Sequence, residues 1–167
     1  MKKIVVVGGG TMGLDIAHTF ARSGHAVVVR EISDELAEKY AEMEKNEVRW
    51  DTKECDDAEV VITAYGTPAR IALTAIENLR AQGVKAGLFR PITLWPYPEA
   101  ALRELSKADH VKAFLDVEMS STGQMIDDVR LAVEGRKPVH YLGHAGGVMP
   151  TVEEIEEAAK KALKEAE

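Results

Sequence analysis

The residue pattern with the clearest chemical use is a glycine-rich turn near the N-terminus. Residues 8–13 read Gly-Gly-Gly-Thr-Met-Gly, which fits the pattern G-x-G-x-x-G. The turn follows a β-branched run at Lys3–Val7 and opens a helical pattern at Thr11–Ser23, as in a strand–turn–helix unit. Free N–H groups and the positive end of the helix dipole at such a turn attract phosphate groups. The sequence therefore predicts a phosphate-binding loop.

Several residues around this turn have separate tasks in binding a dinucleotide. Gly8 permits the tight turn, Gly10 lets the backbone approach a pyrophosphate, and Gly13 lets the helix pack close to the strand. Glu31 follows the next predicted strand, where it would accept hydrogen bonds from ribose hydroxyls and favour NAD over NADP. Arg30 beside it would soften that preference. The alternative interpretation is that the glycines serve only close packing of helix on strand.

The other reactive residues do not form a set of nucleophile, base and orienting group. Residues 120–122 (Ser-Ser-Thr) are expected to cap the following helix, and Glu118 would act as a base only beside a bound substrate. His140 and His144 span a strand end and a loop, without a third ligand nearby, so no metal site is predicted. We therefore predict no catalytic residues and no metal ligands.

Two loops offer weaker candidate sites. Trp95 and Tyr97 are of a type that stacks on a nicotinamide or adenine ring, but we favour a contact surface at Pro91–Pro98, open to self-association. Gly143 and the pair at 146–147 precede a capped helix and resemble a phosphate cradle, although no lysine accompanies them.

Short β-branched runs alternate with longer helical patterns, the order typical of a mainly parallel sheet covered by helices. The predicted strands are Lys3–Val7, Ala26–Arg30, Glu59–Ala64, Lys85–Arg90, Lys112–Val117 and Val139–Leu142, and the charged segment Glu47–Trp50 is a weaker candidate, either an edge strand or a connection. The predicted helices are Thr11–Ser23, Asp34–Lys45, Pro68–Ala81, Pro98–Lys107, Gly123–Glu134 and Val152–Ala166. Thr67 and Thr151 are the expected N-caps of the third and last helices, and Thr151 with Glu154 fits a capping box. The fold class is α/β, a three-layer α/β/α arrangement with a mostly parallel, Rossmann-like sheet, in one domain over residues 1–167.

Composition excludes several classes of function. Lys and Arg total 21 against 28 Asp and Glu, which gives a net charge of −7. Since a negatively charged chain repels a phosphate backbone, no nucleic-acid partner is expected. No apolar stretch approaches the ~18 residues of a membrane span, so no membrane partner is expected either. The single cysteine, Cys55, excludes an internal disulfide and an iron–sulfur cluster held by this chain alone. We expect a cytoplasmic protein.

The stretch IVVVGGGTMGLDIAHTFARSGHAVVVREIS, Ile4–Ser33, resembles the start of 3-hydroxyacyl-CoA dehydrogenases, including the bacterial 3-hydroxybutyryl-CoA type. The resemblance places along the NAD pyrophosphate the residues Gly8, Gly10, Thr11, Met12 and Gly13. Glu31 stands where that family usually has Asp. The resemblance covers residues 1–33, and no motif matches the family's catalytic His–Glu pair. Because the resemblance supplies only half of the usual dinucleotide crevice, any NAD binding is expected to be weak.

From about residue 36 to 167 the chain resembles another family. Four segments carry this resemblance: Asp56–Ala72, Gly87–Leu105, Val117–Gly135 and His144–Ile155. In order and spacing they are similar to the C-terminal, transketolase-C-like domain of the alpha subunit of 2-oxoacid:ferredoxin oxidoreductases. That resemblance implies a packing and organising role, because the family holds thiamine diphosphate and iron–sulfur clusters in other domains or subunits.

Two incomplete families meeting near residues 33–36 favour an engineered chimera. On this hypothesis the chain is an α/β scaffold without a complete active site, retaining at most weak NAD binding, with residues 1–33 as a βαβ unit and 34–167 as the transketolase-C-like part. The alternatives are an NAD-dependent oxidoreductase of the hydroxyacyl-CoA dehydrogenase type and an assembly module of a 2-oxoacid:ferredoxin oxidoreductase. The sequence favours a role other than catalysis. At the join, the first two strands are expected to extend the sheet from an edge, beside Lys85–Arg90.

Overall fold

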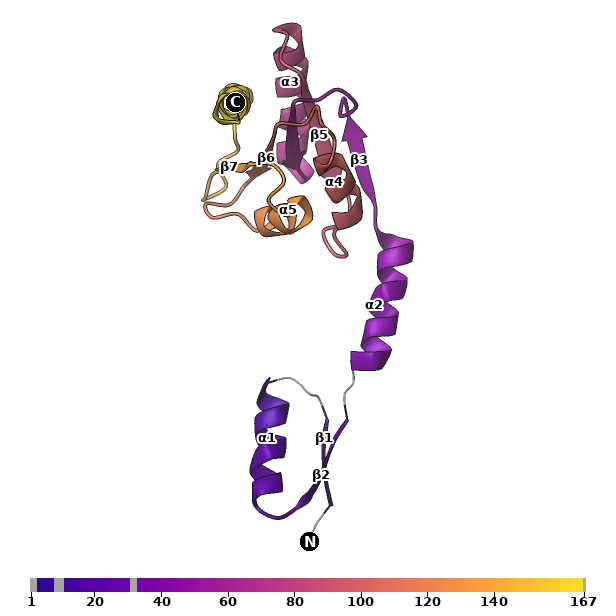
Figure 1. Ribbon diagram of the computed structural model, residues 1–167. Helices are drawn as coiled ribbons and strands as arrows, with labels where there is room; N and C mark the ends of the chain where they lie inside the picture. Colours follow the sequence, from indigo (N-terminus) through magenta and orange to yellow (C-terminus); the bar gives the residue numbers. More distant parts are fainter. Residues whose placement is uncertain (1–2, 8–10, 31–32, 167) are drawn as a thin grey trace. The chain divides into compact units, whose positions relative to one another are not determined.

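The computed structural model describes residues 3–7, 11–30 and 33–166 and divides the chain into two compact units (Figure 1). The first unit is Met1–Asn46 and the second is Glu47–Glu167. The prediction that residues 1–167 act as one domain stays a prediction. None of the helices among the described residues is long and apolar enough to cross a membrane.

The first unit is a strand–helix–strand element followed by a helix. Strands β1 (Lys3–Val7) and β2 (Ala26–Arg30) form a parallel two-stranded sheet, connected by α1 (Thr11–Arg22), and α2 (Ser33–Glu47) follows. The bounds of both strands agree with the prediction. Apolar side chains such as Val5 (56% exposed) and Val28 (45% exposed) remain open to solvent.

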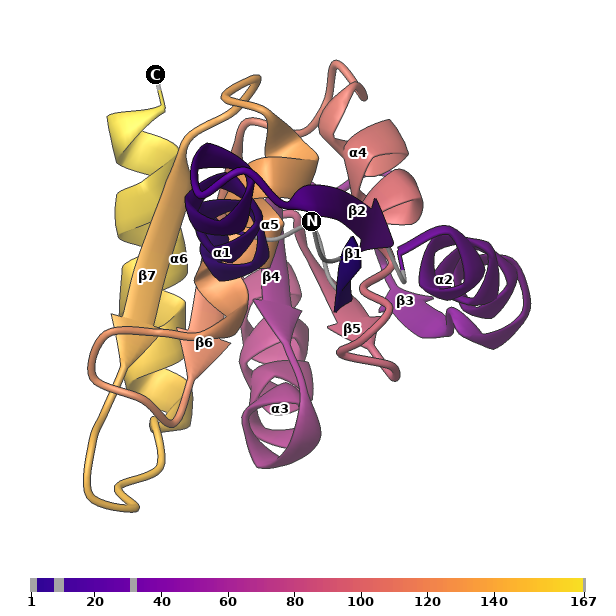
Figure 2. The ribbon, with the colours of Figure 1, turned by 90° about the horizontal axis from the view of Figure 1, so that it is seen from below.

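The second unit is a five-stranded sheet in the order β3-β5-β4-β6-β7, which can be followed across Figure 2. Its strands are β3 (Trp50–Lys53), β4 (Val60–Ala64), β5 (Ala86–Pro91), β6 (Ala113–Glu118) and β7 (Val139–Gly143). Only β3 is antiparallel to its neighbour, and the other pairs are parallel. The predicted α/β class with a mostly parallel sheet is confirmed.

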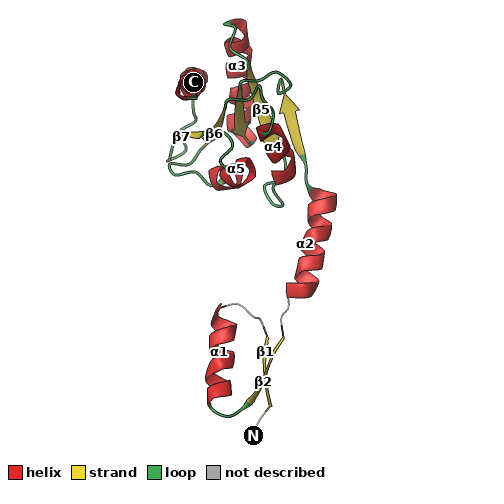
Figure 3. Ribbon diagram, viewed as in Figure 1, coloured by secondary structure: helices red, strands yellow, loops and turns green. Residues whose placement is uncertain are grey.

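Two pairs of helices cover the sheet of the second unit (Figure 3). Helices α3 (Gly66–Ala81) and α6 (Val152–Glu165) pack together on one face, and α4 (Glu99–Ser106) and α5 (Met125–Val133) pack together on the other. Each pair closes a separate apolar cluster. Ile62 and Leu115 belong to the α3/α6 side, whereas Val61 and Phe114 belong to the α4/α5 side. All five residues of β4 are buried, because the central strand is covered on both faces.

The structure corrects two local expectations. The first two strands were expected to extend the main sheet beside β5, but that side of β5 is occupied by β3, which pairs from Trp50 opposite Pro91 to Lys53 opposite Leu88. Strands β1 and β2 form a sheet of their own instead. Thr67 was expected to cap α3, but the N-cap is Tyr65, without a side-chain cap hydrogen bond. The capping box of Thr151 and Glu154 at α6 is confirmed.

Candidate functional site

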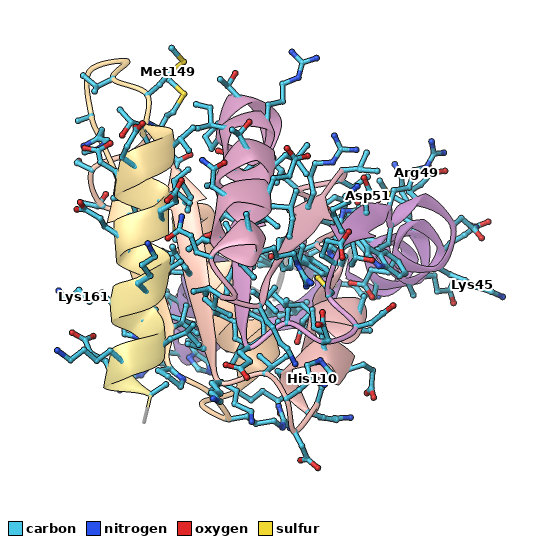
Figure 4. The ribbon with its side chains drawn as sticks, turned by 90° about the horizontal axis from the view of Figure 1, so that it is seen from above. Lys45, Arg49, Asp51, His110, Met149 and Lys161 are labelled. Atoms are coloured by element: carbon cyan, nitrogen blue, oxygen red, sulfur yellow. The ribbon has the colours of Figure 1, made fainter. Side chains whose placement is uncertain are left out.

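The four parallel strands of the second unit end at the same edge of the sheet, which is where α/β folds gather their ligands and contacts. Tyr65 and the loops 92–98, 119–124 and 144–151 follow β4, β5, β6 and β7 at this carboxyl edge. Figure 4 shows Met149, which follows β7, at one end of the sheet and His110, which precedes β6, at the opposite end. Near this edge, two carboxyl groups, those of Asp116 and Glu118, are buried in the core.

Asp116 is a fully buried carboxyl group on β6. Its exposed fraction is 0%, and its Oδ1 accepts a hydrogen bond of 2.8 Å from the Thr63 hydroxyl on β4. Its other oxygen, Oδ2, has no hydrogen-bond partner among the described residues. Burial, followed by the neighbouring Glu118 carboxyl, raises the pKa of Asp116 to about 8. Asp116 is therefore expected to hold a proton at neutral pH.

Glu118, two residues further along β6, is 1% exposed and bound to the start of α5. Its Oε1 accepts the backbone N–H of Gln124 at 2.9 Å and of Ile126 at 3.1 Å, and its Oε2 accepts the same Gln124 N–H at 3.0 Å. A carboxylate at a helix N-terminus also meets the positive end of the helix dipole. Glu118 therefore caps α5, and its oxygens face the chain's own amides rather than an open site.

The loop between β6 and α5 is fitted closely around this cap. Gly123 has φ +79°, and a Cβ there would lie 2.6 Å from Ile126 Cγ2 and 3.1 Å from Glu118 Oε1. The Tyr141 hydroxyl donates to the Ser120 carbonyl. A Cβ on Gly143 would lie 2.2 Å from that carbonyl oxygen. The loop therefore has little room for any larger residue at either glycine.

Two further tyrosines face the buried carboxyl groups. Tyr97 packs against the α4/α5-side cluster, and its hydroxyl is buried without a partner among the described residues. Burial, with the Asp116 charge next, strongly raises the pKa of Tyr97. Tyr65 follows β4, and burial together with the charges of Glu118 and Asp116 raises its pKa as well. Both phenols therefore stay protonated at neutral pH.

A cavity of about 290 Å³ lies at the ends of β4 and β5. Its lining residues are Tyr65, Gly66, Arg90, Pro91, Ile92 and Leu94. Arg90 is the only cationic side chain among them, and its Nη2 is 3.1 Å from Asp51 Oδ2 on β3, so the cation already has an internal partner. The cavity combines one arginine with an apolar rim.

The predicted dinucleotide residues fall mostly where the structure gives no description. Gly8, Gly10 and Glu31 lie outside the described residues. Of the others, Thr11 begins α1, Met12 is 79% exposed, and Arg30 is the last residue of β2. Gly13 lies in the first turns of α1. The NAD site therefore stays a prediction.

The remaining candidate residues have structural contacts. His140 Nδ1 lies 3.4 Å from Glu165, and His144 Nε2 lies 3.2 Å from Glu154, so both join β7 and its following loop to α6. Among the described residues, no group of three or more His, Cys, Asp or Glu is placed to hold a metal ion. The hydroxyl of Ser120 accepts from the Gly123 N–H, but the first amides of α5 are capped by Glu118.

Trp95 and Tyr97 do not form a shared ring pocket. Trp95 is 58% exposed, whereas Tyr97 packs against the core. Sequence reasoning missed Asp116 and Thr63 altogether. The available signal was a carboxyl residue inside the apolar run Ala113–Glu118, where a strand buried on both faces has little reason to carry one.

The family model for pyruvate:ferredoxin oxidoreductase core domain II matches residues 58–155, more than half of the chain. The chain belongs to this family. The matched residues span all of the second unit's parallel strands together with α3, α4 and α5. The resemblance identified from residues 36–167 is thereby confirmed at the level of the domain family.

Curated relatives support the same assignment. Ketoisovalerate oxidoreductase subunit VorB of Methanothermobacter thermautotrophicus is 44% identical over 126 residues, covering 75% of this chain and 35% of the relative. The 2-oxoglutarate synthase subunit KorA of Methanothermobacter marburgensis is 32% identical over 135 residues, covering 79% and 33%. The core domain II chain thus spans about a third of the length of these relatives.

A solved structure shows the same fold. The 2-oxoglutarate:ferredoxin oxidoreductase from Magnetococcus marinus superposes with a TM-score of 0.64 at 21% identity, covering 74% of this chain and 21% of that one. At this identity the likeness concerns the fold alone. It supports the fold described above.

The comparisons correct the hypothesis of an engineered chimera. An identity of 44% to a subunit of a natural enzyme, within a natural domain family, shows a 2-oxoacid:ferredoxin oxidoreductase domain rather than a designed scaffold. The 3-hydroxyacyl-CoA dehydrogenase NAD-binding model matches residues 3–75. That match overlaps the core domain II match at residues 58–75, and the expected division of the chain at residues 33–36 stays a prediction.

Proposed function

We propose that the core domain II chain is the organising domain of a 2-oxoacid:ferredoxin oxidoreductase alpha subunit and assembles with the remaining parts of that enzyme. The observation that carries the proposal is the 44% identity to VorB, which is itself named as a subunit. The chain's single thiol, Cys55, is buried and donates to the Leu88 carbonyl at 3.1 Å. Iron–sulfur ligands must therefore come from other parts of the enzyme.

Exposed apolar side chains at the carboxyl edge provide the surface for this assembly. The loop after β5 carries Ile92 (53% exposed) and Leu94 (44% exposed), and the loop after β7 carries Val148 (57% exposed) and Met149 (53% exposed). In Figure 4 Met149 points away from the ribbon. Apolar side chains gathered at one edge are typical of a contact with another protein surface. We infer that the carboxyl edge is the contact face.

A pair of charge substitutions tests this contact face. Ile92→Lys places a charge on it, and Leu131→Lys places the same charge on α5, where Leu131 is 68% exposed. In a pull-down with the other subunits of a 2-oxoacid:ferredoxin oxidoreductase, we expect Ile92→Lys to weaken retention at least tenfold and Leu131→Lys to leave it unchanged.

Three results would contradict this proposal: equal losses for the two variants, no loss for either, or no retention of the unmodified chain. If light scattering then showed a dimer that Ile92→Lys abolishes, the loop Pro91–Pro98 would instead be a self-association surface.

We further propose that the first unit binds the pyrophosphate of NAD through Gly8, Gly10, Thr11, Met12 and Gly13, with Glu31 and Arg30 beside the ribose. Two observations favour this second role. Strands β1 and β2 are parallel and joined by a helix that begins at Thr11, and residues 3–75 match an NAD-binding family model.

Calorimetric titration of the full chain with NAD⁺ and with ADP-ribose tests the NAD site. We expect weak binding of both ligands, which Gly10→Val abolishes because its side chain would occupy the place of the pyrophosphate. Absence of heat at millimolar ligand, from a chain that unfolds cooperatively, would mean that the glycines serve only the fold.

A further inference from the structure

Two buried carboxyl groups stand side by side on β6. Asp116 and Glu118 are two residues apart, so they lie on the same face of the strand. Both are almost fully buried, at 0% and 1% exposed. Two carboxylates so close in a buried place repel each other strongly, and one proton shared between them removes that repulsion.

The hydrogen bonds show which of the two carries the negative charge. Glu118 accepts the N–H groups of Gln124 and Ile126, and these donors together with the α5 dipole stabilise a carboxylate. Among the residues that the structure describes, Asp116 accepts only the Thr63 hydroxyl, and its Oδ2 has no hydrogen-bond partner. A proton on Oδ2 would give that atom a donor, with the neighbouring Glu118 carboxylate as its acceptor. Burial, and next the neighbouring Glu118 carboxyl, raise the pKa of Asp116 to about 8.

The titratable and charged groups that act on the pair include three tyrosines and two side chains of α5. Tyr65 follows β4, Tyr97 precedes α4 and Tyr141 lies on β7, and burial raises the pKa of each of these phenols. Helix α5 contributes Asp128, whose pKa is also raised by burial, and Arg130, whose charge lowers the pKa of Asp116 less than the other causes raise it. Helix α6 packs on the opposite face of the sheet.

We propose that Asp116 and Glu118 form a proton-dependent latch that holds the start of α5 and the loop 119–124, and that loss of the shared proton releases them. While Asp116 is protonated, Glu118 keeps its place under the first amides of α5. Once Asp116 is ionised, the two charges separate, and the movable partner is Glu118, whose ligands belong to a loop. Release of Glu118 leaves the Gln124 and Ile126 amides without their acceptor.

The sign of the pH dependence follows from the raised pKa. The unfolded chain releases the Asp116 proton near pH 4, whereas the folded chain keeps it to about pH 8. Stability from this group is therefore complete below about pH 4, falls as the pH rises from there, and is lost by about pH 8. The latch does not depend on the contact face proposed above, so it can be tested with this chain alone.

Amide hydrogen exchange of the full chain between pH 6 and 9.5 tests the latch. After correction for intrinsic exchange, we expect protection at Gln124 and Ile126 to fall by up to about tenfold per pH unit between pH 6 and 8 and to level off above pH 8, while the Ile62 amide in β4 reports global unfolding. Asp116→Asn retains the shape and cannot ionise, so its protection at both amides should stay flat. Asp109→Asn, at an exposed position before β6, should behave like the unmodified chain.

Parallel loss of protection in Asp116→Asn and the unmodified chain would overturn the proposal. A second measurement covers the case in which Asp116→Asn does not fold. The side-chain ¹³C resonance of Asp116 in the unmodified chain should titrate with a midpoint between pH 7 and 9. A carboxyl that is already ionised at pH 5 would overturn the latch.

Discussion

At the scale of single residues, the space around a glycine matters as much as its backbone angle. Gly123 and Gly135 both have positive φ values, +79° and +71°. A Cβ on Gly123 would meet Ile126, Tyr141 and Glu118 at 2.6 to 3.1 Å, whereas a Cβ on Gly135 would meet nothing within 4 Å. A substitution at Gly135 therefore tests backbone strain alone, whereas one at Gly123 tests backbone strain together with steric crowding.

Substituting both glycines gives a residue-scale prediction. Gly135→Ala should lower the free energy of unfolding by about 1 kcal/mol, the cost of a left-handed conformation for a residue with a Cβ. Gly123→Ala should lower it by about 3 kcal/mol, because overpacking beside the Glu118 cap adds to the same strain. Urea unfolding of the two variants measures the difference. Equal losses would show that the loop has room at Gly123.

At the scale of elements, helix boundaries followed local signals only in part. The last helix has the capping box that Thr151 and Glu154 predict, because both capping partners are local in sequence. Helix α3 begins at Gly66, two residues before the predicted Pro68, and Thr67 lies inside it. Helix α5 is capped by Glu118 on a strand, a contact that no local pattern could reveal.

The contrast between two threonines is a prediction at this scale. Thr151→Ala removes the acceptor of the Glu154 N–H and should lower the free energy of unfolding by about 1 kcal/mol. Thr67→Ala is the matched control, because Thr67 is exposed and does not cap α3, so a change within about 0.5 kcal/mol is expected. Thermal and urea unfolding both report the effect. A larger loss for Thr67→Ala than for Thr151→Ala would contradict the cap assignments.

At the scale of the whole molecule, the two units differ in what each can stabilise alone. The second unit holds the five-stranded sheet and both apolar clusters. In the first unit, the described residues form a two-stranded sheet with one helix across it, and Val5, Ile16 and Phe20 are at least 40% exposed. Sheets of two strands are marginal in water without further packing.

Separate fragments should therefore behave differently. A fragment of residues 47–167 is expected to unfold cooperatively, with most of the helical circular dichroism of the full chain. A fragment of residues 1–46 is expected to show no cooperative transition. The measurement is urea unfolding followed by circular dichroism. A cooperative transition in the short fragment would show that the βαβ element has a stable core of its own.

The sequence by itself determined the alternation of strands and helices, the burial of β4 and the resemblance to the core domain II family. Local apolar runs and the order of motifs predict these features, so knowledge of contacts between distant residues is not needed. Tertiary structure alone decided that β3 occupies the edge of β5, because strand pairing joins residues that are far apart in the sequence. It also decided that Asp116 and Glu118 meet in a buried place beside Thr63 and the start of α5. The chemistry of that pair depends on desolvation, which only the assembled core provides.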